Sequence, residues 1–578
     1  MKQILERNRL ITTLKKLAGW ISPRLLLLIS LVSVLYYIVG PSRGYFQSDC
    51  TDTIYWAKAT VDAGRLLNPD FGYAALLPFG ANLWLIPMVS IWGMTFSVHI
   101  AGMLIFALVY CAALLILAKQ LGFSIWWTAS LTSAMLLLVS GSDKLREIMW
   151  GHVIYYSLGI LFILVGLALI QKIEKGKRTT LYVVILALFT ACVATDGVQT
   201  IALYFLPLAG SLLLERYFEP TVVEQSGKTR KTLQLMVIML VASILGMLFL
   251  YLVLTRDGII AGYANAYSAY ADSNTWPDNL GKVVPNLLSL YGISVREGVS
   301  LASLESIMLM VKLGGLTVLV VVPAMLLAKY RQIDSCLVKR VLRIHIITTI
   351  IILFLVVIGN LGNSNWRLVP VLGTAILSTV TGLHWLMGDQ RKIVKPQPTQ
   401  VPAGVRANKS INVRREILAS STIGRRVATI GLVVILLNAG LTAVEMLRMP
   451  YDYGQDNHLH QLADYLKDED LLNGYATFWN AQAITLLSDD QVHVRNIQVD
   501  HDGIKLRKYQ SNWNWYQDQT AISRYFILLS TQEYEQLESS PDWSEIESII
   551  EETRLTETGH TLLIVNKNPW MIVGWESG

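Results

Sequence analysis

The chain has 578 residues, of which 53% are hydrophobic and only 16% are charged, whereas a soluble globular protein carries roughly 25% charged residues. The formal net charge is +6, but Lys and Arg stand in short segments between apolar runs and do not alternate with aromatic residues. This pattern excludes a nucleic-acid-binding groove and indicates a membrane protein. The residues after 450 have the mixed composition of a water-soluble domain, so two solvents are implied for one chain.

Eleven apolar segments are candidates for membrane-spanning helices, which need about 20 apolar residues each. We expect spans at 19–39, 97–119, 124–140, 153–171, 181–198, 200–214, 235–255, 306–328, 344–360, 368–387 and 428–446. The first follows a basic N-terminus and lacks a small-residue cleavage site, so it is predicted to be a retained helix. The pair 181–198 and 200–214 is either one broken helix or two short ones, and only two helices preserve the alternation of charge.

The alternation of charge predicts the orientation of the spans. Basic residues gather in four segments, at 172–178, 216–231, 329–343 and 388–427, and the segments between them on the other side are sparse in Lys and Arg. Because cytoplasmic loops carry the excess of Lys and Arg, the N-terminus is expected inside and the C-terminus outside. The cell membrane, most simply a bacterial plasma membrane, is the predicted location.

The predicted fold class is therefore mainly α: a polytopic transmembrane helical bundle with a small C-terminal extracytoplasmic α/β domain. We expect the transmembrane domain at 1–450, with a cytoplasmic linker at 388–427 that is flexible over its Pro-rich part at 395–410. The soluble domain is expected at 451–578.

The C-terminal domain shows mixed periodicity. Residues 458–467 have a helical pattern, 491–499 alternate as a strand, and 525–529 and 561–565 are short aliphatic or β-branched runs. Trp513 and Trp515 stand among polar residues, and they either stack on a sugar ring or pack the core of the domain.

The first outer loop is the richest in chemical groups. Asp49 and Asp52 come a few residues after the first span and lead into a short helical stretch at 53–63, which Gly64 is suited to end. Pro78 and Gly80 then turn the chain back toward the membrane.

These residues resemble the GT-C superfamily of integral-membrane glycosyltransferases, and most closely its branch of protein mannosyltransferases and aminoarabinose transferases. The resemblance rests on an acidic residue directly after the first helix, a helix with Ala and aromatic residues, Gly64 fifteen positions after Asp49, and the return WLIPMVSIWGMTFSVHIAGMLIF. The segment NSNWRLVPVLGTAIL at 363–377 is similar to the Arg-Tyr-x-x-Pro start of a late helix in that branch. Leu368 replaces the aromatic residue there, and Pro370 comes one position early. The resemblance covers about the first 390 residues.

The resemblance implies a donor in which a sugar is linked to polyprenyl phosphate, and transfer to a glycan, lipid or protein acceptor on the extracytoplasmic face. Asp49 matches the acidic position of the family and is the candidate general base. Asp52 is a second catalytic candidate, or else it only stabilises the start of the helix. Members of this branch generally use no metal, so no cofactor is expected, although a divalent metal remains possible. No nucleic-acid partner is expected.

Other charged residues near the outer ends of spans are candidates for substrate binding. Glu147 and His152, in the loop after 124–140, are candidates for contact with the acceptor or a metal, and Lys144 and Arg146 for contact with phosphate; the alternative is a solvated turn. Arg367 either binds the lipid phosphate through its guanidinium fork or extends to the membrane interface.

Three further features remain open. The loop at 256–305 is rich in Tyr and Asn, and it is predicted to be a substrate loop that contains Trp276 and Asp278. Asp196 is either a cavity residue or part of an Asp-Gly turn, and Lys312 either faces a cavity or extends to the interface.

Alternative functions differ in class from a glycosyltransferase. A lipid-linked-sugar transporter or flippase should show paired broken helices or repeated halves, and neither is clear in the sequence. A polysaccharide polymerase or ligase should concentrate Arg and His in one large outer loop, whereas the loop at 256–305 contains two Arg residues and no His. A glycan-binding cell-envelope assembly protein without catalysis stays compatible with the sequence.

Overall fold

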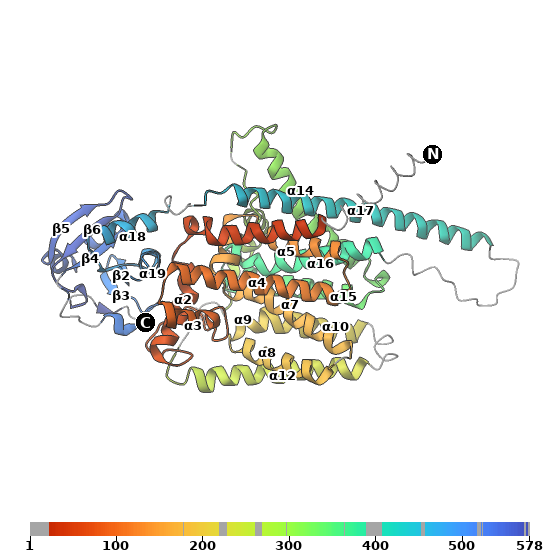
Figure 1. Ribbon diagram of the computed structural model, residues 1–578, viewed down its shortest axis with the longest axis horizontal. Helices are drawn as coiled ribbons and strands as arrows, with labels where there is room; N and C mark the ends of the chain where they lie inside the picture. The colour runs from red at the N-terminus through yellow and green to blue at the C-terminus, as the bar shows by residue number, and fades with distance from the viewer. Residues whose placement is uncertain are drawn as a thin grey trace, which may run out of the picture.

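Two kinds of structure follow one another along the chain: a bundle of long apolar helices, and then an α/β domain at one end of that bundle (Figure 1). The computed structural model describes residues 22–176, 178–218, 228–259, 269–295, 297–362, 364–388, 407–451, 457–516, 522, 524–571 and 574–575. The mainly α fold expected from the hydropathy pattern is confirmed.

Nine helices within these ranges are long and apolar enough to cross a membrane. They are Ser22–Val39, α4 (Phe96–Gln120), α7 (Tyr155–Glu174), α9 to α10 (Val198–Phe218), α12 (Lys228–Phe249, apolar from Lys231 to Leu254), α14 (Leu304–Ala328), α15 (Cys336–Val357), α16 (Val369–Gly388, apolar from Asn365) and α17 (Ala407–Arg448, apolar from Gly424). Large apolar side chains such as Leu28, Leu252 and Ile430 are exposed on their outer faces, as expected for helices that contact lipid.

Two further apolar segments complete the positions at which spans were expected. The helix α5 (Ile125–Leu137) continues to Ser140 and then bends by 113° into the segment Asp143–Gly151. The helix α8 (Thr179–Ala194) is shorter, with 16 residues, and a turn at 195–197 separates it from α9 (Val198–Thr200). Gly197 has a φ of 80° in that turn, which only Gly adopts readily. The two-helix interpretation of this region is therefore correct.

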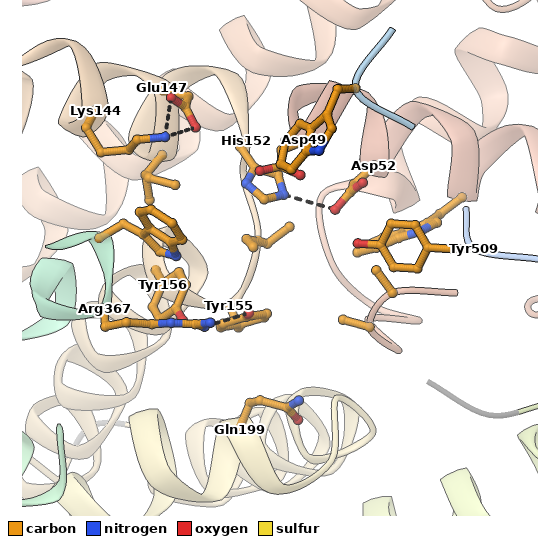
Figure 2. Close-up of a pocket in the computed structure, with 17 residues that line it drawn as sticks. Asp49, Asp52, Lys144, Glu147, His152, Tyr155, Tyr156, Gln199, Arg367 and Tyr509 are labelled. Carbon is orange, nitrogen blue, oxygen red and sulfur yellow. Dashed lines mark hydrogen bonds and ion pairs between the residues drawn. The ribbon is translucent and has the colours of Figure 1, made fainter. Parts of the chain in front are cut away.

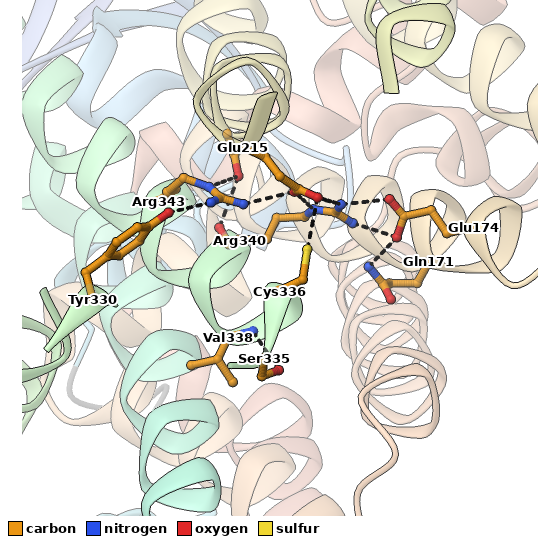
Figure 3. Close-up of polar contacts among 10 residues, drawn as sticks. Gln171, Glu174, Glu215, Tyr330, Ser335, Cys336, Val338, Arg340 and Arg343 are labelled. Atoms are coloured by element: carbon orange, nitrogen blue, oxygen red, sulfur yellow. Dashed lines mark hydrogen bonds and ion pairs between the residues drawn. The ribbon is translucent and has the colours of Figure 1, made fainter. Parts of the chain in front are cut away.

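A buried ion cluster joins the ends of three helices (Figure 3). Arg340 of α15 lies 2.7 Å from Glu174 of α7 and 2.8 Å from Glu215 of α10 (Leu206–Phe218), and Arg343 lies 2.9 Å from Glu215. The cluster contains two cations and two anions, so its charges balance. Arg340 is almost wholly excluded from solvent. The cluster fixes these helices relative to one another at the end of the bundle away from the α/β domain.

The linker predicted at 388–427 is only partly described. Residues 389–406, with most of the Pro-rich stretch, lie outside the described residues. Residues 407–427 continue without a break into α17 as a helix of 42 residues, so this half of the linker is helical. The sequence contains no Pro or interior Gly before Gly424 in this part, which permits the helix to extend.

The C-terminal domain is built on a seven-stranded sheet with the order β5-β6-β4-β1-β2-β3-β7. Its strands are β1 (Asn473–Thr477), β2 (His493–Asp500), β3 (Gly503–Leu506), β4 (Tyr525–Leu529), β5 (Ile550–Leu555), β6 (Thr561–Val565) and β7 (Gly574–Trp575). Strand β1 pairs in parallel with both β2 and β4. The helices are α18 (His458–Asp468), α19 (Phe478–Leu487), α20 (Thr531–Glu538) and α21 (Trp543–Glu547). The predicted helix at 458–467 and the predicted strand at 491–499 are present, and the aliphatic runs at 525–529 and 561–565 are the strands β4 and β6.

The first outer loop joins the C-terminal domain through main-chain hydrogen bonds. Gln510 N donates to Gly72 O at 2.6 Å, and Gly72 N donates to Ser511 O at 3.0 Å. A Cβ atom at position 72 would lie 1.5 Å from the carbonyl oxygen of Lys508, so only Gly permits this approach. These contacts place residues from both ends of the chain in one site.

Candidate functional site

A cavity of about 310 Å³ lies where the first outer loop, the bent segment after α5 and the start of α16 meet the C-terminal domain (Figure 2). Its lining comprises Asp49, Asp52, Trp56, Ala74, Ala75, Lys144, Glu147, Ile148, His152, Ile154, Tyr155, Tyr156, Gln199, Trp366, Arg367, Trp479 and Tyr509. The structure thus brings together five of the eight site residues predicted from sequence, with Lys144 as well.

Asp52 is held by groups from two distant parts of the chain. It begins α2 (Asp52–Ala63), whose first-turn N–H groups favour a carboxylate, and Gly64 ends this helix in the left-handed conformation. Its Oδ2 lies 3.0 Å from His152 Nε2, and its Oδ1 accepts a hydrogen bond of 2.5 Å from Gln510 Nε2. Burial raises the pKa of Asp52 to about 6, although the contacts with His152 and Gln510 act in the opposite direction.

His152 directly follows a π-helical turn (Glu147–Gly151). The backbone N–H of His152 donates to Glu147 O at 2.6 Å and closes this turn. Burial alone would lower the pKa of His152, but the hydrogen bond to Asp52 and the charges of Asp49 and Glu147 outweigh it, so the pKa lies above its ordinary value. The other ring nitrogen, Nδ1, is buried and makes no hydrogen bond to a residue in the described ranges. Asp52 and His152 therefore form a coupled, buried acid–base pair.

Asp49 differs from Asp52 in having no such support. It lies in a short 3₁₀ turn (Ser48–Thr51) and is half-buried at the cavity wall next to His152 (Figure 2). No hydrogen bond or ion pair links its carboxylate to any residue that the structure describes. Its oxygens are thus available to a ligand in the cavity.

Lys144 and Glu147 form an ion pair at another side of the cavity (Figure 2). Lys144 Nζ lies 2.7 Å from both oxygens of Glu147, and Gln47 Nε2 donates to Glu147 Oε1 at 2.9 Å. The ammonium group also lies 5.0 Å from the centre of the Trp366 ring, a favourable cation–π distance. The pair keeps a movable positive charge at the cavity wall.

Arg367 lies in a short 3₁₀ turn (Asn365–Leu368) just before α16 and is buried, with 6% of its surface exposed. Its guanidinium donates to the Tyr156 hydroxyl, lies 3.5 Å from the Tyr155 hydroxyl, and packs on the rings of Tyr156 and Trp366. Arg367 is more buried than the solvated side chain expected at a membrane interface. Its side chain is part of the cavity wall.

Three predicted site residues do not line this cavity. Arg146 is buried on the opposite side of its turn, where it donates to Ser140 O at 2.8 Å and pairs with Asp143. Trp276 and Asp278 begin α13 (Trp276–Leu290); the Trp276 indole donates to Ala271 O, and Asp278 pairs with Lys282 on the exposed surface. Any role of these three in binding remains a prediction.

The two buried ionisable residues left open by the sequence lie outside the cavity as well. Lys312 is 3.2 Å from Glu445 and donates to Gly141 O, so it joins α14 to α17. Asp196 is buried in the turn between α8 and α9, and neither carboxylate oxygen makes a hydrogen bond to a described residue.

The sequence analysis did not identify the contribution of the C-terminal domain to the cavity. Gln510 is 1% exposed, contacts Asp52 across 458 positions of sequence, and is itself held by the Trp56 indole at 2.8 Å. Trp479 and Tyr509 also line the cavity. A single Gln after a strand carries no sequence signal for such a role. Trp515 packs edge-on against Tyr55 and Phe71 of the first outer loop, whereas Trp513 is exposed beneath Lys508.

A second, largely apolar cavity of about 290 Å³ shares Tyr155 and Gln199 with the first. The rest of its lining is Val198, Ala202, Ala269, Tyr270, Phe354, Leu355, Gly359 and Leu361. The predicted substrate loop contributes Ala269 and Tyr270, so part of that loop does border a cavity.

Within the described residues, no group of three or more His, Cys, Asp or Glu side chains is arranged to hold a metal ion. The metal requirement of this protein therefore stays a prediction.

No protein-family model and no curated protein sequence matches the chain. Among solved structures, ArnT from Cupriavidus metallidurans in the apo state superimposes with a TM-score of 0.50 at 10% identity, over 97% of this chain and 100% of that one. The chain has the fold of ArnT. The same ArnT bound to undecaprenyl phosphate gives a TM-score of 0.49 at 11% identity, with the same coverage. The archaeal oligosaccharyltransferase AglB from Archaeoglobus fulgidus, in complex with an inhibitory peptide and a dolichol-phosphate, gives 0.42 at 10% identity over 95% and 75% of the two chains. The superposition on apo ArnT supports the fold that the resemblance implied, and it extends over the C-terminal domain.

Proposed function

We propose that this protein is a GT-C-type membrane glycosyltransferase that moves a sugar from a polyprenyl-phosphate donor to an acceptor at the extracytoplasmic face. The proposal rests on the residues that line the cavity of about 310 Å³, which is called the larger cavity below. An unshared carboxylate, Asp49, and a buried acid–base pair lie in the same cavity as two cations, Lys144 and Arg367. Transfer from a phosphate-linked donor needs both kinds of group within one ligand's length.

The acceptor hydroxyl attacks the anomeric carbon of the donor as the bond between that carbon and the phosphate oxygen breaks. The bonding electrons leave with the lipid phosphate, and the hydroxyl proton passes to Asp49. The products are the glycosylated acceptor and the polyprenyl phosphate. Asp49 suits the role of base because its oxygens accept no hydrogen bond from the residues described, while those of Asp52 are already occupied by His152 and Gln510.

The departing phosphate needs positive charge that is already in place. The planar fork of Arg367 matches two phosphate oxygens, and the aromatic rings of Tyr156 and Trp366 hold it in position. Lys144 can exchange Glu147 for phosphate as the charge on the leaving group develops. Asp49 and Asp52 place two carboxylates beside the oxocarbenium-like sugar.

The apolar cavity supports a lipid-linked donor over a soluble sugar nucleotide. It meets the polar cavity at Tyr155 and Gln199, and its walls come from α9, α15 and the loop at Ala269 and Tyr270. A prenyl chain in the apolar cavity would place its phosphate between Arg367 and the carboxylates of Asp49 and Asp52. ArnT with bound undecaprenyl phosphate and AglB with a dolichol-phosphate provide precedents for such a ligand.

The test is sugar release from labelled polyprenyl-phosphate sugars by the full-length protein in membranes. Wild type is compared with Asp49→Asn, and with Asp62→Asn as the matched control, because Asp62 sits at the far end of α2 in an ion pair with Lys58. The expected result is turnover by wild type and Asp62→Asn, and a loss of about 10²–10⁴-fold in Asp49→Asn, the range for removal of a general base.

If wild type consumes no polyprenyl-linked donor of any sugar, the glycosyltransferase proposal fails, and transport of a lipid-linked sugar becomes the function to test. Equal turnover by wild type and Asp49→Asn would keep the reaction class but reject Asp49 as the base.

A further inference from the structure

The C-terminal domain contains a small polar cavity that the proposed transfer reaction does not use. It lies where the parallel strands β1, β2 and β4 begin, and has a volume of about 20 Å³. The lining residues are Asn473, Gly474, Tyr475, His493, Arg495, Trp515, Ile522, Tyr525 and Asn568. Since a buried water needs about 10–15 Å³, the cavity admits the oxygens of one small polar group but not a sugar ring.

Arg495 is the unexplained charge in this cavity. Its guanidinium lies 5.0 Å from the centre of the Trp515 ring, and it makes no hydrogen bond or ion pair to any residue in the described ranges. The nearby carboxylate, Asp490, instead faces His493 Nδ1 at 3.4 Å. Arg495 is half-buried, and the reduced contact with water lowers the pKa of its guanidinium. An Arg that lines a cavity and whose donors contact no described residue favours an anionic ligand.

Asn568 supplies a second donor with a fixed direction. Its amide oxygen accepts hydrogen bonds from the Tyr475 hydroxyl at 2.6 Å and from the backbone N–H of Trp570 at 3.3 Å. The amide nitrogen makes no hydrogen bond to a described residue, and Asn568 is one of the residues that line the cavity. Because the oxygen is engaged on one side, the NH₂ group is left to donate into the cavity.

We propose that Arg495 and Asn568 form an oxyanion-binding site, which takes a phosphate or carboxylate group of a ligand that approaches the C-terminal domain. The guanidinium fork binds two oxygens, and the amide NH₂ donates to one of them. The aromatic side chains of Tyr475, Trp515 and Tyr525 surround the charged group and exclude water. This site goes beyond the proposed transfer reaction and does not depend on it.

The site is close to the larger cavity but separate from it. Trp515 contacts Tyr55, whose helix α2 begins with Asp52, and the ring centroids of Trp515 and Tyr55 are 5.8 Å apart. The two cavities share no lining residue. An anion held by Arg495 would therefore sit outside the cavity that contains Asp49 and Asp52.

The test is titration calorimetry of the full-length protein in phosphatidylcholine nanodiscs with three probes: inorganic phosphate, glucuronate and neutral methyl glucoside. We expect one or both anions to bind and methyl glucoside not to bind. Phosphate alone would identify a phosphorylated ligand and glucuronate alone an acidic sugar. The affinity for the anion should fall at least tenfold in Arg495→Gln, and less in Arg495→Lys, which keeps the charge but not the fork. Asn568→Asp keeps the acceptor for Tyr475 and replaces the donor, and should also weaken binding.

Two matched variants separate this site from other cations. Arg554→Gln removes an Arg of the same domain that is already paired with Glu469 and Glu552, and it should leave the affinity unchanged. Arg367→Gln removes anion binding in the larger cavity and should leave the Arg495-dependent binding intact, whatever the outcome of the transfer assay. The proposal would be overturned if neither anion binds. It would also be overturned if folded Arg495→Lys and folded Asn568→Asp proteins each bind the anion with the affinity of wild type.

Discussion

Replacement of Gln510 by Met tests how the C-terminal domain controls the acid–base pair. The side chain keeps a similar volume but loses the amide that donates to Asp52 Oδ1 at 2.5 Å. That hydrogen bond lowers the pKa of Asp52, which burial raises to about 6. A hydrogen bond to a charged group contributes about 1.5–3 kcal/mol, and about 1.4 kcal/mol corresponds to one pKa unit. The loss should therefore raise the pKa of Asp52 by about 1–2 units.

The assay is the pH dependence of donor turnover. If turnover needs the ionised Asp52, its acid limb should move from about pH 6 to about pH 7–8, and activity at pH 6 should fall by about 5- to 50-fold while the plateau at high pH changes less. Because Asp52 and His152 titrate together, the limb reports the pair. Gln498→Met is the control, since the Gln498 amide donates to Asp500 on β2 and does not line the cavity.

A second variant distinguishes the pH effect from a loss of stability. Trp56→Phe removes the indole that donates to Gln510 but leaves the bond to Asp52 intact, so it should destabilise the protein without a shift of the acid limb. An acid limb that is the same in wild type and a folded Gln510→Met would refute the reasoning.

Three other predictions concern the ion cluster, the domain contact and pH. Glu215→Ala should lower the free energy of unfolding by about 3–5 kcal/mol, because it leaves two buried arginines undercompensated; thermal unfolding measures this. Gly72→Ala should detach the C-terminal domain, since the new Cβ would lie 1.5 Å from Lys508 O, and limited proteolysis should then cut the chain faster. The stability contributed by the Asp52–His152 pair should fall as the pH rises above about 4, because burial raises the pKa of Asp52 from 3.8 to about 6 and the pKa of His152 is raised as well, so that the folded state binds more protons than the unfolded state in this range. His152→Gln should flatten the slope.

Each of these predictions has an outcome that would contradict it. Gly281→Ala is the control for Gly72→Ala, because a Cβ there meets open space; equal proteolysis of the two would show that the domain contact tolerates the change. A Glu215→Ala protein as stable as wild type would mean that the cluster relaxes without cost. Stability that rises with pH over the same window would contradict the assigned pKa directions.

The sequence predicted the bundle because a bilayer imposes a length and an apolar composition on each span. The helices α8 and α10 are found at the two positions where span length and apolar composition gave the weakest prediction. Asp49, His152 and Arg367 were found because ionisable groups at the ends of apolar spans are costly unless they have a role. Arg146 was placed in the same group as Lys144, but residues two apart on a helical turn face different sides, and the sequence alone did not show which side meets the cavity.

Gln510 could not be predicted for a different reason. Its role depends on the docking of the C-terminal domain onto residues 70–72, and that contact includes main-chain hydrogen bonds, which any residue type can make and which therefore give no sequence signal. The position of Arg495 at the start of a strand gives no sign that the guanidinium lacks a protein partner, since this depends on residues such as Asn568 that lie far along the chain.

Assembly of one cavity from both ends of the chain also sets an order of events during synthesis. His152 and Gln510 are 358 positions apart (510 − 152), and at about 5–20 residues per second this distance takes about 20–70 s to translate. During that interval Asp52 has no amide donor and the cavity lacks the wall that Trp479 and Tyr509 provide. The proposed transfer reaction would therefore become possible only when the C-terminal domain has folded onto the first outer loop.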